Sequence, residues 1–552
     1  MPPDPDSEGA PALVLVRPAA ALPPAARTFA ALEAAFPVRF EPWCEDIPVA
    51  AGLIDIVDDP SVCEPPRGAD RVLVMTREPA GVGEVELHFT DDEGVDRSLR
   101  GRDLYRHVAV GRLEGSPMDR PLCAGPDGPV WTRRSRNVVV DRVAAELPTL
   151  APDENLRAHL SVHRALALVA VVHFLRAVCG DAAPARPRLR AAFLFDDPNL
   201  PRLTYGYLDF RRLADHARAH GYHAAMAMVP LDTTRPGRPQ AAPLFREHPR
   251  QLSLVMHGNN HEHRELLRPA SAMAARRLAA QALRRVAGFE RRTGLRVDRV
   301  MTPPHGLCSR ATTAALADLS YDALCAIHPV PWTERPGAAR PLAGWHPADF
   351  VEGCAILPRL PLTCSATEFA LRAFLGQPLV LYGHHQDCAT GLDALAQAAE
   401  RVNGLGDVEW SSVGWIGEHN RELQVAGCAA IVRPWSGRVR LVLPAEVKTL
   451  TVRSPFAGAQ ESGLAGWRVA GEAGGLVAFG ETLELESSPE GGPREVTVSV
   501  EPARTLSATE VEAPRLAPVS TARRRVTEAR DRLTPALDRL GRTARPARRG
   551  ER

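Results

Sequence analysis

The feature that most constrains this chain is a short apolar run, Ala191 to Phe195, that leads directly into Asp196, Asp197 and Pro198. An apolar run of this length with aromatic residues predicts a strand buried on both faces, as in a parallel sheet. Pro198 ends the strand because proline has no backbone N–H to donate. Carboxylates at the C-terminal end of a buried strand are where barrel and open α/β enzymes place their chemistry, although the same residues also suit a simple Asp-Pro turn.

Length and composition limit the class of protein. A chain of 552 residues exceeds the usual size of one domain, so several domains are expected. The net charge of +1 and the lack of an uninterrupted apolar run of membrane-spanning length predict no nucleic-acid partner and no integral membrane segment. The first residues carry acids and prolines where a signal peptide is basic, and the ten cysteines form no C-x-x-C pairs. Both features favour a cytoplasmic protein with reduced thiols.

The order of predicted elements divides the chain into five parts. Residues 1–146 alternate short apolar strands with helical stretches, which predicts a small α/β domain of unknown role. Residues 147–187 are expected to form a connecting helix and linker, and residues 188–422 repeat strand and helix in the manner of one barrel. Residues 423–502 alternate apolar and polar positions between turns, which predicts an all-β, sandwich-like module. Residues 503–552 are rich in proline and arginine and are expected to be flexible.

The tail is the most highly charged part of the chain. Residues 523–552 hold eleven arginines against four acids, a net charge of +7. Val526, Leu533, Leu537 and Leu540 indicate a short amphipathic helix in this region. A solvated tail is the expectation, and contact with an anionic surface or an acidic partner is the alternative.

Histidines follow two further predicted strands. One strand ends at His257, and His261 comes four residues later, a spacing at which two neutral imidazoles can converge on one cation. The last predicted strand is followed by His384 and His385, with Asp387 close behind, which is the pattern of a general acid with an orienting carboxylate.

Neither pattern is distinctive by itself. The pairs His159/His163 and His216/His220 have the same spacing on predicted helices, where they are expected to be surface or packing residues. The Asp-Asp-Pro tripeptide also recurs, at Asp58. What separates the candidates from these copies is their position directly after predicted strands.

Taken in order, the strand ends resemble the motifs of the polysaccharide deacetylase (NodB-homology) superfamily over about residues 190–420. The motifs are Asp196-Asp197, His257-x3-His261, the turn Pro303-Pro304-His305-Gly306, and His384. The resemblance implies an irregular (β/α)7-type barrel, in an α/β chain with the N-terminal domain and β module described above. It further implies a metal-dependent hydrolase that removes N- or O-acetyl groups from a carbohydrate or polysaccharide.

The resemblance also assigns roles to residues. Asp197, His257 and His261 would bind a divalent metal, with zinc favoured over cobalt, manganese or nickel. Such a set leaves coordination positions open for water and a carbonyl oxygen. Asp196 would be the general base and His384 the general acid, with His385 as the alternative acid. The residues expected to line the substrate groove are Asn260, Pro304, His305 and Trp332.

Four positions depart from the family pattern. Asn260 stands where many members have a small or aromatic residue. Pro198 stands where the family usually has glycine, Thr302 replaces the arginine that orients the base, and His305 replaces a tyrosine. Two other functions therefore stay open. One is a non-catalytic glycan-binding or scaffold protein on a degenerate barrel. The other is a glycosidase of the same fold superfamily, which would need two carboxylates flanking the scissile bond.

Overall fold

The computed structural model divides the chain into two compact units. The first unit comprises Met1–Arg186, Glu334–His346 and Ser365–Leu375, and the second comprises Pro187–Thr333, Pro347–Cys364 and Gly376–Arg552. The structure describes residues 11–44, 50–64, 68–78, 84–108, 111–114, 118–161, 163–183, 186–327, 340–455, 463–470, 475–485, 492–512 and 518–543.

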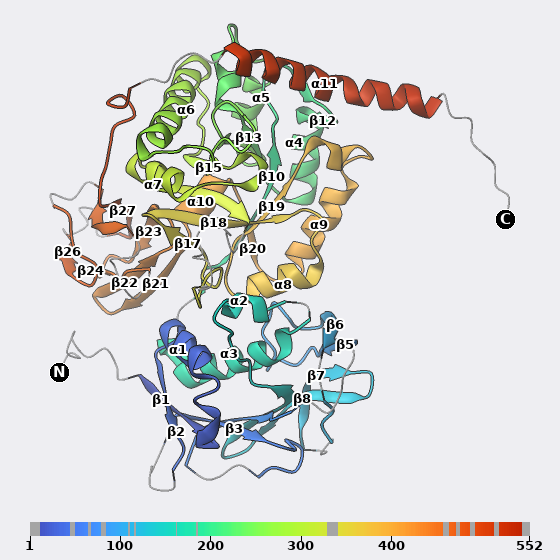
Figure 1. Cartoon of the computed structure of the whole chain (residues 1–552), viewed down its shortest axis with the longest axis vertical. Coiled ribbons are helices and arrows are strands. Elements are labelled where there is room, and N and C mark those ends of the chain that lie inside the picture. The colour runs from blue at the N-terminus through green and yellow to red at the C-terminus, as the bar shows by residue number, and fades with distance from the viewer. Residues whose placement is uncertain are drawn as a thin grey trace. The chain divides into compact units, whose positions relative to one another are not determined.

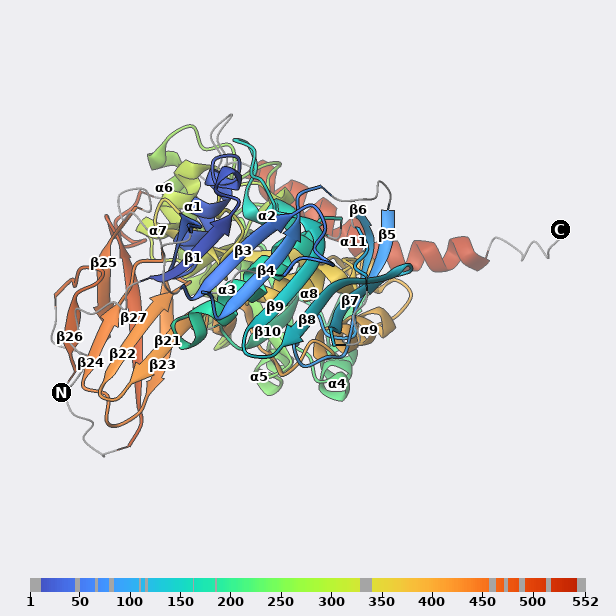
Figure 2. The same ribbon diagram turned by 90° about the horizontal axis from the view of Figure 1, so that it is seen from below.

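The first unit is built on one nine-stranded sheet of order β2-β1-β3-β4-β9-β8-β7-β5-β6. Its first half pairs in parallel, and the half from β9 to β6 pairs antiparallel (Figure 2). Helices α1, α2, α3 and α8 complete the unit, as expected of an α/β domain. The bounds are β1 Ala12–Arg17, α1 Ala26–Ala35, β2 Val38–Pro42, β3 Gly52–Val57, β4 Arg71–Thr76, β5 Glu84–Phe89, β6 Asp103–Val108, β7 Arg120–Gly125, β8 Gly128–Ser135, β9 Val139–Glu146, α2 Leu156–His159, α3 Ala165–Cys179 and α8 Ala366–Phe374.

Helix α3 is the most apolar helix of this unit. Among the described residues, the stretch Ala165–Ala182 alone is long and apolar enough to cross a membrane by length and composition, and 61% of it is buried inside the structure. The core helix of a globular domain meets the same criteria, so this stretch is weak evidence for a membrane span.

Seven parallel strands of the second unit close into a barrel. Strand β10 pairs with β13 on one side and β19 on the other, and β14, β15, β16 and β18 complete the ring (Figure 1). This confirms the irregular (β/α)7-type barrel. The bounds are β10 Leu189–Asp196, β13 Ala224–Met228, β14 Leu252–His257, β15 Val300–Thr302, β16 Ala323–Ile327, β18 Cys354–Pro361 and β19 Leu379–Gly383.

Helices follow most of these strands, and their ends are set by local sequence. The side chain of Asp209 caps the start of α4, and Gly221 ends it with a φ of 67°, a left-handed conformation that glycine adopts without strain. Additional strands lie at the edge of the barrel. The bounds are β11 Thr204–Tyr205, β12 Leu208–Asp209, α4 Phe210–His220, α5 Ala242–Glu247, α6 Ala272–Thr293, α7 Arg310–Asp318, β17 Asp349–Val351, α9 Asp393–Asn403, β20 Val408–Trp410 and α10 Val413–Glu418.

The predicted β module follows the barrel and contains two sheets. One has the order β21-β22-β24-β26 and the other β23-β27-β25. Buried residues from both sheets, including Val432, Leu441 and Trp467, form one core, as in a small sandwich. The bounds are β21 Arg421–Ala426, β22 Ala429–Pro434, β23 Arg438–Leu443, β24 Thr449–Val452, β25 Leu464–Val469, β26 Thr482–Glu484 and β27 Arg494–Pro502.

The tail differs from the flexible segment expected from sequence. Pro518–Thr543 forms a single helix, α11, of 26 residues, and its first half lies across one end of the barrel (Figure 1). Contacts with the loops at the strand ends hold the helix there. One sign of this is Arg524, whose side chain is buried against the barrel and only 3% exposed. A composition rich in arginine predicts disorder only when the charges lack partners, and the barrel supplies carboxylates to this helix.

Candidate metal centre

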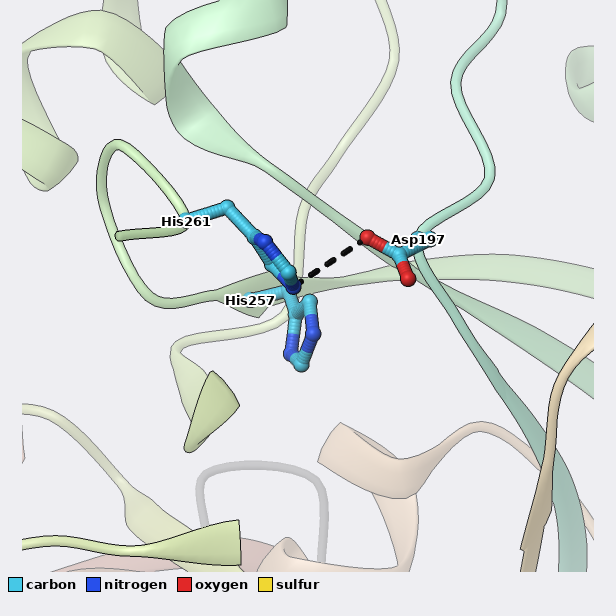
Figure 3. Close-up of side chains that lie close together, drawn as sticks. All are labelled: Asp197, His257 and His261. Carbon is cyan, nitrogen blue, oxygen red and sulfur yellow. Dashed lines mark ion pairs between the residues drawn. The ribbon is translucent and has the colours of Figure 1, made fainter. Parts of the chain in front are cut away.

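The predicted ligands come together at the C-terminal ends of β10 and β14, the two strands that flank β13 in the barrel. Asp197 follows β10, His257 ends β14, and His261 lies in the loop after β14 (Figure 3). Their nitrogen and oxygen ligand atoms all lie within 4.8 Å of one another, and His261 Nε2 is 3.3 Å from Asp197 Oδ1. One carboxylate and two imidazoles at this separation form a donor set that suits a divalent cation.

The His257 ring is oriented by Thr302. His257 Nδ1 lies 2.9 Å from Thr302 Oγ1, and the Thr302 hydroxyl donates to the carbonyl of Met256 at 3.0 Å. The hydroxyl proton is therefore committed, so Nδ1–H of His257 must be the donor to Thr302. This tautomer leaves the Nε2 lone pair available to a metal, the usual arrangement for a ligating histidine. Thr302, which replaces the expected arginine, thus orients a candidate metal ligand.

The loop that presents His261 is held by a buried carboxylate. Glu265 accepts backbone N–H bonds from Asn259, Asn260 and His261 at 2.7–3.1 Å. Burial raises the pKa of Glu265 to about 7 despite these three bonds. Gly258 is needed beneath the loop, because a Cβ there would lie 2.5 Å from Glu265 Oε2.

Backbone strain gathers at the same place. Asp197 has a φ of 82° and His261 a φ of 59°, conformations that cost a residue with a side chain free energy. Pro198 follows Asp197 and is buried, so the position where the family has glycine is filled by a second restricted residue. Strain of this kind persists where the surrounding structure fixes the backbone, as it does at functional sites.

Burial controls the protonation of the ligand candidates. It lowers the pKa of His261 to about 4 and also lowers the pKa of His257, because a charged imidazolium loses its hydration. Both rings are therefore neutral near pH 7, the form that binds a metal. Burial alone would raise the pKa of Asp197, but the neighbouring His261 and Arg524 hold that pKa below its usual range.

Asp196 has a partner that the sequence did not reveal. Arg359 on β18 places Nη1 3.0 and 3.1 Å from the two carboxylate oxygens of Asp196, and both side chains are buried. The Arg359 guanidinium also lies 4.4 Å from the centre of the Tyr382 ring. An arginine inside an otherwise apolar strand was the available signal, since a buried charge requires a partner. The arginine absent at position 302 thus has a counterpart on a different strand.

A second missed residue comes from α11. Arg524 donates from Nη1 to Asp197 Oδ1 at 3.0 Å and from Nη2 to the Asp197 carbonyl at 2.7 Å. Its Nε donates to Asp232 Oδ2 at 3.1 Å. A cation and this guanidinium would therefore share one carboxylate. Only the fold could show this contact, because 327 residues separate Arg524 from Asp197.

The two candidate acids lie in different environments. His384 is exposed, and its charge contributes to the low pKa of Asp197. His385 is 2% exposed, packs against the ring of Tyr205, and lies 3.9 Å from Asp531. Asp387 engages His384 in a reciprocal turn: its carboxylate accepts the backbone N–H of His384 at 2.7 Å, and its own backbone N–H donates to the His384 side chain.

The predicted groove residues are only partly gathered. The Asn260 side chain is engaged, because its oxygen accepts from Arg285 at 2.7 Å. Pro304 is buried, whereas His305 is exposed with its ring centre 5.4 Å from that of His261. Trp332 lies outside the described residues.

Comparison with known proteins adds the following. No family model matches the chain, and no curated protein matches it. Among solved structures, it is similar to a protein from Mycobacterium smegmatis assigned as a polysaccharide deacetylase, with 18% identity over 43% of this chain and 94% of that one and a TM-score of 0.31. It is also similar to a family 4 carbohydrate esterase from Streptomyces lividans in complex with acetate, with 16% identity over 42% and 94% of the chains and a TM-score of 0.26.

A third similar structure is a family 4 pseudoenzyme from Bacillus anthracis, with 9% identity over 43% of this chain and 67% of that one and a TM-score of 0.25. With TM-scores below 0.5, these likenesses carry no weight for activity, which has to be inferred from the side chains.

Proposed function

We propose that this chain is a metal-dependent hydrolase that removes an acetyl group from a carbohydrate. The observation that carries the proposal is the convergence of Asp197, His257 and His261 beside the Asp196–Arg359 pair. Nitrogen and carboxylate donors favour zinc, with cobalt, manganese and nickel as other candidates. A divalent cation at these three residues would polarise the acyl carbonyl and lower the pKa of a water.

The chain's own residues supply the remaining chemistry. Asp196 would accept the proton of the attacking water, with Arg359 holding its carboxylate in place. His384 would return a proton to the leaving amine or alcohol, a role that suits an exposed imidazole better than the enclosed ring of His385. The exposed ring of His305 next to His261 would form one wall of the substrate site.

Acetate release tests the activity. Acetylated oligosaccharides are incubated with the full chain and added zinc, cobalt, manganese or nickel. We expect metal-dependent acetate release that Asp196→Asn lowers by at least about 100-fold, the scale of a lost general base. Asp58→Asn is the matched control, because it changes the same Asp-Asp-Pro tripeptide at an exposed site. Equal rates for Asp196→Asn and wild type would reject Asp196 as the base.

Metal content tests the centre separately. We expect Asp197→Ala/His261→Ala to lose bound metal, whereas His216→Ala/His220→Ala, a helical pair with the same spacing, should retain it. Equal metal content in wild type and the first double variant would exclude this site.

The second candidate is a non-catalytic glycan-binding or scaffold protein. It is favoured by one observation, the Arg524 guanidinium that already neutralises Asp197. Binding of acetylated oligosaccharides without acetate release under every metal condition would support it.

We also propose a cytoplasmic location. Buried cysteines such as Cys123, Cys325 and Cys354 are free thiols, which suits a reducing compartment. Localisation of a tagged full chain by cell fractionation would test this.

A further inference from the structure

Helix α11 contacts the barrel through its polar face. Its residues that are at most 8% exposed recur every three or four positions and include Ser520, Arg524, Glu528 and Asp531. Ser520 bonds to Glu262, Arg524 to Asp197, and Asp531 accepts from the Tyr205 hydroxyl at 2.9 Å. The helix is therefore reversed relative to an ordinary surface helix, which turns its apolar face to the core.

The opposite face carries an apolar seam at heptad spacing. Val519, Val526 and Leu533 lie seven residues apart and are 79%, 70% and 58% exposed. The alanines between them, Ala522, Ala529 and Ala536, are also exposed. These six residues, which we name the outer seam, occupy the a and d positions of a coiled coil, a narrower stripe than the core-facing side of an amphipathic helix. An exposed apolar stripe of this kind marks an interaction site.

The charged residues that flank the outer seam are basic, and Leu537, at another e position, is 62% exposed. Arg523 and Arg530 occupy e positions and Arg525 a g position, and all three are exposed. Two acids of the helix turn the other way, since the side chains of Glu528 and Asp531 are 9% and 5% exposed against the barrel, and a third, Asp538, is exposed and accepts from the Tyr207 hydroxyl. Any partner of the outer seam therefore meets a positive charge on both flanks.

The charge and shape of the outer seam indicate which kind of partner it can bind. A second copy of α11 would place arginines against arginines across the seam, which disfavours self-association. Half of the outer seam is alanine, so it offers little of the bulky apolar surface by which a helix inserts into a lipid interface. An amphipathic helix with acidic e and g positions matches both the seam and its flanks.

We propose that the outer seam of α11 binds an acidic amphipathic helix of a partner protein, forming a heterotypic coiled coil. The barrel already holds α11 in helical form, so this side of the interface is preorganised. Both views show the last turns of α11 extending beyond the barrel, which leaves the helix open to a partner along its length (Figures 1 and 2). The proposal is independent of the hydrolase activity.

Two synthetic helices of opposite charge provide the test. Each has about four heptads with leucine at a and d, and carries either glutamate or lysine at e and g. Fluorescence anisotropy of the labelled peptides is measured against the full chain. We expect binding of the acidic peptide but not the basic one, with an affinity that falls as salt is raised. The double variant Arg523→Glu/Arg525→Glu should reverse the preference between the two peptides.

Variants on the seam separate specific pairing from general adhesion. Leu533→Glu should lower the affinity for the acidic peptide by about tenfold or more. Val442→Glu, at a 55% exposed valine on β23, should leave that affinity unchanged. Circular dichroism checks that each variant is folded. Absence of binding, or equal binding of both peptides, would overturn the proposal. So would seam-dependent binding to vesicles of phosphatidylcholine and phosphatidylglycerol, or self-association, without binding of the acidic peptide.

Discussion

Arg524→Gln should strengthen the binding of a divalent metal while weakening the metal-free fold. Arg524 Nη1 lies 3.0 Å from Asp197 Oδ1. A cation on that oxygen at the usual distance of about 2.1 Å would lie no more than about 5 Å from the guanidinium nitrogen. At an effective dielectric constant of about 20, the guanidinium then repels each unit of charge on the cation by about 3 kcal/mol.

Solvent reduces this repulsion, because the Asp197 side chain is 19% exposed. We therefore expect a net gain of about 3 kcal/mol in binding a divalent cation, or roughly 100-fold in Kd. The fold should survive the substitution, since Asp232 keeps its bonds from Arg235 at 3.1 Å and Asn199 at 3.0 Å. Loss of a buried ionic partner should still lower the stability of the metal-free protein by about 3 kcal/mol.

Isothermal titration of metal-free protein with zinc measures the affinity, and thermal unfolding with and without zinc measures both effects. Arg525→Gln is the matched control, because Arg525 is the next residue of α11 and is exposed. An affinity in Arg524→Gln that equals or falls below that of the control would refute the reasoning. It would mean that Arg524 supports Asp197 as a ligand instead of competing with the metal.

Three further outcomes follow from the site and its surroundings. Arg359→Met should destabilise the fold by about 3–5 kcal/mol, since it leaves the Asp196 carboxylate buried without its partner, and Asp196→Asn/Arg359→Met should recover most of this loss in denaturant titrations. Thr302→Val should weaken zinc binding by about 10- to 100-fold in calorimetric titration, because His257 Nδ1–H loses the closer of its two acceptors and keeps only the carbonyl of residue 302 at 3.2 Å, and an unchanged affinity would contradict that role. Burial raises the pKa of Asp298 to about 6, so the stability that its protonated form contributes is present below about pH 4 and is lost as the pH rises through 6. In denaturant titrations, the free energy of unfolding of Asp298→Asn should therefore rise by about 3 kcal/mol relative to that of wild type as the pH increases across this range. A difference in stability between the two proteins that does not change with pH would contradict a raised pKa of this carboxyl group.

The parts of the site that could be predicted are those encoded locally. The run Ala191 to Phe195 followed by two carboxylates gives a strand end, and His257 with His261 gives another. Parallel strands of one barrel bring their C-terminal ends to the same rim. Once a barrel was predicted, motifs that are recognisable in the sequence at separate strand ends could therefore be expected to lie close together. The turn alternative for Asp196-Asp197-Pro198 fails to account for their partners, since both acids are engaged by charged side chains.

Other features depended on contacts between distant segments. The motifs favoured His384 as the acid and left His385 as the alternative, and only the fold shows that His384 is exposed whereas His385 is enclosed beside Tyr205 and Asp531. A Cβ at Gly206 would lie 2.2 Å from His385 Nδ1, so the hairpin after β10 closes over that ring. The side chains of adjacent residues after a strand point in different directions, and the surroundings of each side chain are formed by loops from elsewhere in the chain.

The sequence by itself determined the barrel, the three metal-ligand candidates and the β module, because each rests on a periodicity or a strand end that lies within a few residues. Only the tertiary structure decided that Arg359 pairs with Asp196, that Thr302 orients His257, and that α11 brings Arg524 to Asp197. A buried charge requires an opposite charge, but it does not specify from where in the chain the partner comes. For α11 the same requirement explains why a charged tail is docked as a helix. Its polar face pairs with carboxylates of the barrel, and the outer seam faces away from the barrel.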